Sequence, residues 1–184
     1  MSHNNNHPLG EAPWGHVIFS TGLGTGFFPW GPGTLGAFMA LAIWYGLYLW
    51  LGATLALTLV TAGLIVVVTI LGAWTSAVME RYWGEDPRTV NIDEYVGTWM
   101  PLLVAPIGDH TAITMLSGFL GFLFFRIIDI FKLFGCRKVE EKIHGGWGVM
   151  LDDIAAGAYA LVFLWILRVL VFIPWAKGLD AVIK

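Results

Sequence analysis

The sequence predicts an all-α integral membrane bundle with about four to five membrane helices plus an N-terminal interfacial or re-entrant segment. Hydrophobic residues make up 57% of its 184 residues and charged residues only 12%, which is about half the charged share of a typical water-soluble domain. The mean hydropathy is +0.72. Ten tryptophans and twelve phenylalanines suit membrane interfaces as well as helix packing.

Five apolar runs, separated by polar or turn-forming stretches, are the expected membrane helices. In chain order they cover residues 34–50, 53–79, 95–107, 111–131 and 149–173. A hydrocarbon core about 30 Å thick needs about 20 helical residues, so the third run is short for a crossing. Only a tight turn separates the first two runs, which predicts that they are antiparallel neighbours.

The two ends of the chain differ from these runs. Residues 14–32 are apolar but broken by glycine and proline, which favours an interfacial or re-entrant segment. Residues 1–13 are polar and lack the basic and apolar regions of a signal peptide, so we expect a mobile leader. A single membrane-embedded domain then covers residues 14–175, and residues 176–184 form a short tail.

Basic residues gather on one side of the expected bundle, provided that the run 95–107 crosses. The turns near residues 51 and 108 contain no lysine or arginine. The polar segments on the other side contain Arg81, Arg88, Lys132, Arg137, Lys138 and Lys142. By the positive-inside rule, these segments face the cytoplasm.

Overall charge and cysteine content exclude other classes of protein. A net charge of −3 and a pI near 5.9 argue against a nucleic-acid partner, which requires a basic surface. The single cysteine, Cys136, excludes an intramolecular disulfide and a thiolate metal cage.

A glycine-rich stretch, STGLGTGFFPWGPGT at residues 20–34, precedes the first long run. Glycines allow backbone amides to approach an anion closely, and such a nest or helix N-terminus can bind phosphate. The candidate phosphate-binding residues are Gly24, Gly26, Gly33 and Thr34. The alternative interpretation is a broken loop at the membrane interface, with Thr34 as a helix cap.

Acidic residues recur where three polar stretches meet the same membrane face. Asp93 and Glu94 begin one apolar run, Asp129 lies near the end of another, and Asp152 and Asp153 lie near the start of the last. Each has a simpler explanation by itself. Asn91 or Asp93 can cap a helix, and Arg126 can form an ion pair with Asp129 three residues later.

The five carboxylates are harder to explain together than one by one. At one end of a small bundle, in a low dielectric, they repel one another and favour protonation. A hard divalent cation relieves this repulsion, and an all-oxygen ligand set favours Mg²⁺, Mn²⁺ or Ca²⁺ over zinc. Arg126 and Lys132 lie on one helical face near these acids. A carboxylate-held cation beside basic side chains and a glycine loop is suited to phosphoryl chemistry.

Four ordered motifs resemble the phosphatidylglycerophosphatase A family of bacterial membrane phosphatases. They are GTGFFPWGPGTLGAF, IDEYVGTWM, FRIIDIFK and HGGWGVMLDDIAAG, and the resemblance extends from about Trp14 to Ile173. It implies an all-helical bundle, Mg²⁺ dependence, and removal of the terminal phosphate of phosphatidylglycerophosphate to give phosphatidylglycerol at the inner leaflet. One departure is that family members usually follow the motif lysine with prolines, whereas this chain reads KLFGCRK from Lys132.

Our leading hypothesis is therefore a Mg²⁺-dependent lipid phosphatase, multi-pass in the bacterial inner membrane, with phosphatidylglycerophosphate and the bilayer as its partners. The expected metal ligands are Asp93, Glu94, Asp129, Asp152 and Asp153. Arg126 and Lys132 neutralise the phosphate, and His144 protonates the leaving glycerol oxygen. Either water or an aspartate attacks phosphorus.

Two other functional classes stay open at this point. Intramembrane acids often line ion paths, so a cation or small-anion transporter is the first alternative. The second is a non-catalytic assembly subunit. Arg168, inside the last run, is expected to snorkel to the interface or to form an ion pair.

Overall fold

The computed structural model describes residues 12–84, 87–132 and 145–183, and within these ranges every regular element is helical. Four helices are long and apolar enough to cross a membrane. They are α2 (Pro32–Leu51), α3 (Leu55–Trp83), α5 (Thr111–Ile130) and a continuous helix over Gly146–Ala181. The predicted class, a helical membrane bundle, is thus confirmed.

Shorter elements complete the fold. The segment before α2 forms α1 (Trp14–Ser20) and a 3₁₀ turn (Thr25–Phe27). With only seven residues, α1 is too short to cross a bilayer, and it packs against α3. The run expected at 95–107 contains α4 (Asp93–Leu102), which is also short.

The first two long helices form the expected hairpin. Pro32 occupies the first turn of α2, where its missing N–H costs nothing. Gly52, at φ +67°, ends α2 in a left-handed conformation that favours glycine. Thr54 then caps α3, because its side-chain oxygen accepts a hydrogen bond from the Leu57 N–H at 3.4 Å.

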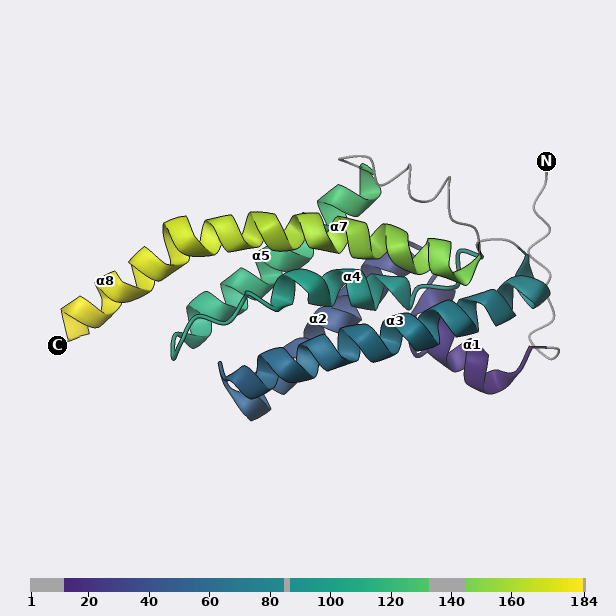
Figure 1. Ribbon diagram of the computed structural model, residues 1–184, viewed down its shortest axis with the longest axis horizontal. Coiled ribbons are helices and arrows are strands. Elements are labelled where there is room, and N and C mark those ends of the chain that lie inside the picture. Colours follow the sequence, from purple (N-terminus) through teal and green to yellow (C-terminus); the bar gives the residue numbers. More distant parts are fainter. Residues whose placement is uncertain (1–11, 85–86, 133–144, 184) are drawn as a thin grey trace.

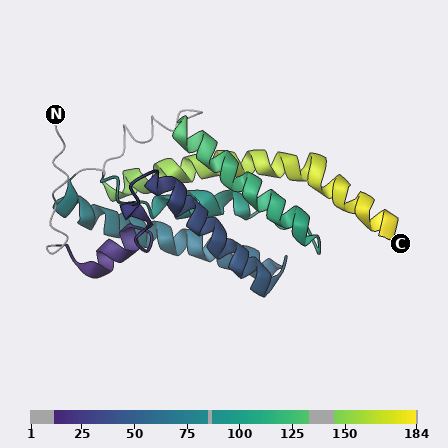
Figure 2. The ribbon, with the colours of Figure 1, turned by 180° about the vertical axis from the view of Figure 1, so that it is seen from behind.

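The short helix α4 lies in the middle of the bundle. It packs against α2, α3, α5 and α7 (Gly146–Leu167), and every one of its residues is buried or half-buried. α3 and α7 flank it on one side (Figure 1), and α2 and α5 lie side by side on the other (Figure 2). Side chains at the start of α4 are therefore enclosed by the other helices.

Two glycines allow α4 and α7 to approach closely. A Cβ atom built on Gly157 would lie 2.6 Å from the Gly97 carbonyl oxygen. A Cβ atom on Gly97 would lie 3.0 Å from the Asp153 carbonyl oxygen. A side chain would not fit at Gly157 and would be crowded at Gly97, so the two glycines let the acidic turn of α7 pack directly against α4.

After α4 the chain continues to the opposite end of the bundle without long helical structure. α4 ends at Leu102, and α5 begins at Thr111. The Tyr48 hydroxyl, near the end of α2, donates to Thr111 Oγ1 at 3.3 Å. α5 therefore starts at the end of the bundle where α2 finishes, and it returns antiparallel to the direction of α4.

The last helix is longer than the sequence predicts. α7 is followed by a π-helical turn over Arg168–Phe172 and by α8 (Ile173–Ile183). These three elements form one curved helix that projects beyond the rest of the bundle (Figure 1). Residues 176–183, which we expected to be a tail, are helical, whereas residues 1–11 of the expected leader lie outside the described residues.

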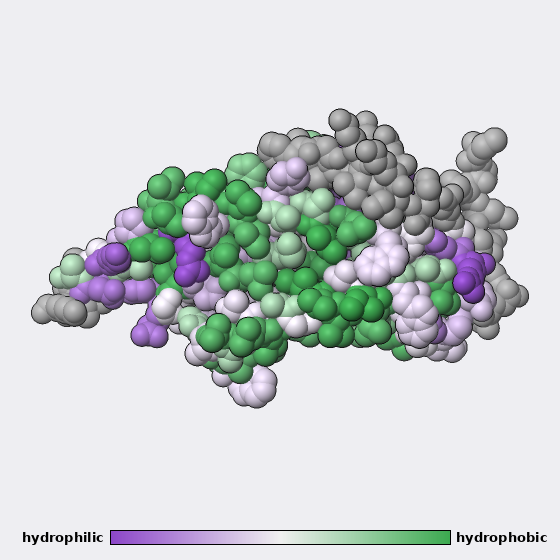
Figure 3. All heavy atoms as spheres, viewed as in Figure 1, coloured by the Kyte–Doolittle hydropathy of each residue, from purple (hydrophilic) through white to green (hydrophobic). Residues whose placement is uncertain are grey.

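The outer surface is that of a membrane protein. Large apolar side chains face outward along α3, including Leu59, Val66 and Ile70, which are 62%, 58% and 54% exposed. Apolar residues cover the middle of the visible face, and hydrophilic residues gather toward its ends (Figure 3). An apolar surface of this extent requires cover, which the hydrocarbon of a bilayer provides.

Candidate active site

The predicted acids come together at the end of the bundle where α2, α4 and α7 begin and α5 ends. Asp129, Asp152 and Asp153 each offer a carboxylate oxygen, and these atoms lie within 4.8 Å of one another. Asp129 comes from the last turn of α5 and is half-buried, while Asp152 and Asp153 come from the second turn of α7 and are each 5% exposed. Adjacent residues on α7 thus reach one cluster with Asp129.

Arg126 joins three helices beside this cluster. Its Nη1 donates to Glu94 of α4 and, at 2.9 Å, to Asp129 Oδ2 on its own helix. Its Nη2 donates to Thr34 Oγ1, at the start of α2, at 3.2 Å. The expected Arg126–Asp129 ion pair is present, and Glu94 is a second, equally enclosed partner. Arg126 Nε is buried and has no acceptor among the described residues.

Lys132 reaches the cluster from just beyond α5. Its Nζ forms an ion pair with Asp152 and lies 3.8 Å from Asp129 Oδ1. The residue has φ +47°, a left-handed conformation that ends the helix and turns the chain. In this chain, which reads KLFGCRK from Lys132, the side chain at this left-handed turn contacts the acids.

The glycine-rich segment contributes to the site only through its last residues. A Cβ atom on Gly33 would lie 1.9 Å from Glu94 Oε1 and 3.5 Å from Arg126 Nη2, so this backbone touches the charged groups. Gly26 instead packs against the Thr89 carbonyl, 1.8 Å from the position of a Cβ atom. Gly24 has φ +90°, and no atom lies within 4 Å of a Cβ atom built on it. Glycine is therefore favoured at residue 24 by the backbone conformation of the turn and not by close packing.

Asn91 supports this arrangement. It is one of the two capping residues that the sequence suggested, but it does not cap α4. Its Nδ2 donates to Thr25 Oγ1 at 2.9 Å and to the Pro32 carbonyl at 3.1 Å. Neither Asn91 nor Asp93 makes a capping hydrogen bond, and Ile92 occupies the capping position. Asn91 therefore ties the glycine-rich segment to the start of α2, a role visible only once the two segments are seen side by side.

Asp93 and Glu94 lie at the same end but are placed differently from the three clustered aspartates. Glu94 is engaged by Arg126, while Asp93 Oδ1 is buried without a hydrogen-bond partner among the described residues. Burial, together with the neighbouring Glu94, raises the pKa of Asp93 well above its ordinary value. Burial also raises the pKa of Glu94 to about 7, although Arg126 acts in the opposite direction. The ionised forms of Asp93 and Glu94 are therefore disfavoured unless further positive charge lies close to them.

The donor set fits a hard divalent cation. Among the described residues, five carboxylates gather with two cationic side chains, Arg126 and Lys132, so the acids outnumber the cations. The Oδ2 of Asp153 is buried and accepts no hydrogen bond from the described residues, as expected for an atom that is available to a ligand. Oxygen ligands of this kind suit Mg²⁺. His144, the predicted proton donor, lies outside the described residues.

The chain matches a known family over the segment that contains these site residues. The family model described as phosphatidylglycerophosphatase A matches residues 18–168, which includes every motif described above. No solved structure matches the chain.

Curated relatives match over most of their length. A protein of Bacteroides thetaiotaomicron named "Putative phosphatidylinositol-3-phosphatase" is 44% identical, over 83% of this chain and 92% of its own. The Escherichia coli protein named phosphatidylglycerophosphatase A is 31% identical, over 83% of this chain and 82% of its own. The Haemophilus influenzae protein of the same name is 28% identical, over 82% and 87%. With a family match that spans both the acidic cluster and the helices that build it, the chain belongs to the phosphatidylglycerophosphatase A family of phosphatases.

Proposed function

We propose that this protein is a Mg²⁺-dependent lipid phosphatase that hydrolyses the terminal phosphomonoester of phosphatidylglycerophosphate to phosphatidylglycerol. The observation that carries the proposal is the convergence of Asp129, Asp152 and Asp153 within 4.8 Å, beside Arg126 and Lys132, at one end of a membrane bundle. Family membership supports the same reaction.

Asp129, Asp152 and Asp153 would hold the cation, with Asp93 close enough to influence them. Mg²⁺ bound there would supply positive charge to phosphoryl oxygens and help to activate the attacking group. Glu94 is less suited to ligation, because Arg126 already occupies its carboxylate.

Arg126 is held in position to contact a phosphate. Glu94, Asp129 and Thr34 fix the guanidinium from three helices, so little side-chain entropy is lost when an anion binds. Its buried Nε–H has no acceptor among the described residues and can donate to a phosphoryl oxygen. Lys132 adds a second positive charge at the edge of the acids.

Hydrolysis breaks the bond between phosphorus and the glycerol oxygen and forms a bond between phosphorus and the attacking oxygen. The leaving oxygen takes a proton, for which His144 is our candidate donor. If water attacks directly, single-turnover reaction in ¹⁸O-water gives phosphate that contains the label. Phosphate without label would exclude direct attack by water and would indicate an aspartyl phosphate that water opens at the carboxyl carbon, which leaves the label on the protein.

We propose that the site faces the cytoplasm of a bacterial inner membrane. Arg81, in the last turn of α3, and Arg88, which follows α3, are both exposed and lie near this end. The turns at the opposite end contain no lysine or arginine between residues 51–54 or 103–110. This asymmetry supports a cytoplasmic position by the positive-inside rule.

Removal of the metal should abolish activity. Purified protein in detergent is expected to release phosphate from phosphatidylglycerophosphate with Mg²⁺ and to lose that activity in EDTA, because the acids then repel the anionic substrate. Restoring Mg²⁺ should restore the rate. Release of inorganic phosphate is the measurement.

Two results would count against this proposal. Equal rates in EDTA and in Mg²⁺ would exclude metal dependence. Metal-dependent ion flux in proteoliposomes without phosphate release would favour the transporter, an alternative that the family comparison does not support.

A second lipid should be compared directly with phosphatidylglycerophosphate as a substrate. The Bacteroides relative is named for phosphatidylinositol 3-phosphate, which also presents a phosphomonoester on a lipid headgroup. We expect phosphatidylglycerophosphate to have the higher kcat/KM, as the family description suggests. A higher value for phosphatidylinositol 3-phosphate, measured with both lipids in the same detergent, would reassign the substrate while keeping the reaction.

Gly33 provides a test of the site geometry that leaves every charge in place. A methyl group in Gly33→Ala would lie 1.9 Å from Glu94 Oε1, so the Glu94 carboxylate must move and Arg126 with it. Misplacement of about 1 Å costs up to about 100-fold in rate, and we expect kcat/KM to fall by about 10- to 100-fold.

The matched control is Gly46→Ala on the same helix, where no atom lies within 4 Å of the added methyl group. This variant should keep wild-type kcat/KM. Both variants should remain folded, because the displaced atoms of Glu94 are the end of a flexible side chain. Equal activity of the two variants would contradict the placement of Gly33 in the site.

A further inference from the structure

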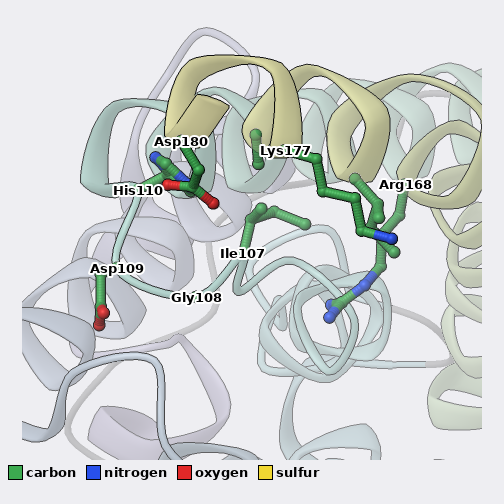
Figure 4. Close-up of a pocket in the computed structure, with 9 residues that line it drawn as sticks. Ile107, Gly108, Asp109, His110, Arg168, Lys177 and Asp180 are labelled. Atoms are coloured by element: carbon green, nitrogen blue, oxygen red, sulfur yellow. The ribbon is translucent and has the colours of Figure 1, made fainter. Parts of the chain in front are cut away.

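A cavity lies at the opposite end of the bundle from the acidic cluster. It has a volume of about 370 Å³ and is bounded by the turn at residues 107–110 and by the last helix. Figure 4 shows His110 and Asp180 at one side of it, and Lys177 and Arg168 extending toward the other. None of these residues takes part in the site described above.

The position of Lys177 places this cavity at the level of lipid headgroups. On the last helix the acidic cluster ends at Asp153, and Lys177 follows 24 residues later, or about 36 Å at 1.5 Å per residue. This distance exceeds the thickness of the hydrocarbon core, about 30 Å. Arg168 lies nine residues before Lys177 on the same helix and lines the same cavity.

The acidic side chains that line the cavity lie apart from its two basic side chains. His110 Nε2 lies 3.3 Å from Asp180 Oδ1, so the acid is engaged by the histidine. Asp109 is exposed on the turn and points away from Arg168 and Lys177 (Figure 4). In the described part of the chain, neither Arg168 nor Lys177 forms an ion pair with a carboxylate.

Arg168 is positioned by the backbone of the segment that follows α4. Its Nη1 donates to the Val104 carbonyl at 2.5 Å, and it opens the π-helical turn Arg168–Phe172. Such turns are rare and often occur at functional sites. One nitrogen is thus anchored, while the other guanidinium donors are available to a ligand.

We propose that this cavity binds a phosphate group, supplied by an anionic phospholipid of the leaflet opposite the acidic cluster. Two cations that have no carboxylate partner among the described residues, beside a cavity of headgroup size, match one phosphate diester. The acyl chains would lie along the apolar outer face of the last helix, where Leu170 is 69% exposed. The inference does not depend on the proposed function, because it concerns the other end of the molecule.

Native mass spectrometry of the full-length protein in EDTA tests the proposal. Phosphatidylglycerol, phosphatidylcholine and inorganic phosphate are each titrated into wild-type protein and into the double variant Arg168→Gln/Lys177→Gln. EDTA leaves the acidic cluster without a cation that would attract an anion there. Removal of two charged donors should weaken the tightest phosphatidylglycerol binding by about tenfold or more. Phosphatidylcholine, which has no net charge, should bind weakly to both proteins.

Two further variants keep the test decisive. Arg81→Gln/Arg88→Gln removes two exposed charges at the other end and should leave the tightest phosphatidylglycerol binding unchanged. Lys177→Gln alone changes an exposed side chain, so it should fold and should show part of the loss if the double variant does not fold.

The arms of the experiment also distinguish the source of the phosphate. Loss of lipid binding in the cavity variants, without a change for inorganic phosphate, supports a lipid headgroup. An equal loss for inorganic phosphate supports a site for free phosphate. Identical binding of both anions by the wild-type protein and the cavity variants would overturn the proposal.

Discussion

Asp153→Asn is expected to lower phosphate release from phosphatidylglycerophosphate by at least about 100-fold, because loss of even an outer partner of a metal ligand costs about 10- to 100-fold. Asp153 is 5% exposed, its Oδ2 accepts no hydrogen bond from the described residues, and it shares a cluster with Asp129 and Asp152. Asparagine keeps the shape of the side chain but removes the charge and one oxygen ligand. The measurement is kcat/KM at saturating Mg²⁺.

The same substitution should not destabilise the protein when metal is absent. Three carboxylates with oxygens within 4.8 Å of one another repel, and removing one charge reduces that repulsion. We therefore expect the Tm of Asp153→Asn in EDTA to equal or exceed that of the wild type. Added Mg²⁺ should raise the wild-type Tm and have a smaller effect on the variant, since a ligand that binds the folded state more weakly stabilises it less.

The control for Asp153 is Asp109→Asn, on an exposed turn at the opposite end. It makes the same chemical change and should alter neither kcat/KM nor the Mg²⁺-dependent rise in Tm. Activity of Asp153→Asn near the wild-type level would remove Asp153 from the proposed metal site. A lower Tm in EDTA would show that its carboxylate stabilises the bundle and is not simply repelled.

The sequence predicted the parts of this fold that depend on apolar length. The long runs became α2, α3, α5 and α7, because burial in lipid requires helices of about 20 residues whatever their neighbours. The positions of the helix ends were predicted less accurately. α7 begins at Gly146 and not at residue 149, and helical structure continues beyond residue 173 to Ile183. Glycine and polar residues at these ends give weak signals, and packing decides them.

The site was predictable in its residue types but not in its pairings. Spacing by three indicated the Arg126–Asp129 pair, whereas the Arg126–Glu94 pair joins residues 32 positions apart. Gly33 and Gly24 look alike in the sequence, yet only Gly33 touches the charged groups. Such contacts depend on how α2, α4 and α5 cross. The separation of Arg168 from the carboxylates of the described residues is likewise a property of the assembled helices.

Arg126→Gln is expected to lower the free energy of unfolding by about 3–5 kcal/mol, because it leaves Glu94 buried without a cationic partner. The two side chains are only 11% and 12% exposed, so water cannot readily replace the lost ion pair. The double variant Glu94→Gln/Arg126→Gln removes both charges and should recover most of that loss. A double-mutant cycle of unfolding in detergent measures the coupling.

The matched control for Arg126 is Arg81→Gln, an exposed arginine near the same end, which should change stability by less than about 0.5 kcal/mol. If the double variant is no more stable than Arg126→Gln, then Arg126 stabilises the bundle through Thr34 and Asp129 and not through Glu94. Activity separates the two roles of the residue. A double variant that folds but releases no phosphate has lost the group that binds the substrate, whereas one that recovers both stability and activity would show that Arg126 only neutralises Glu94.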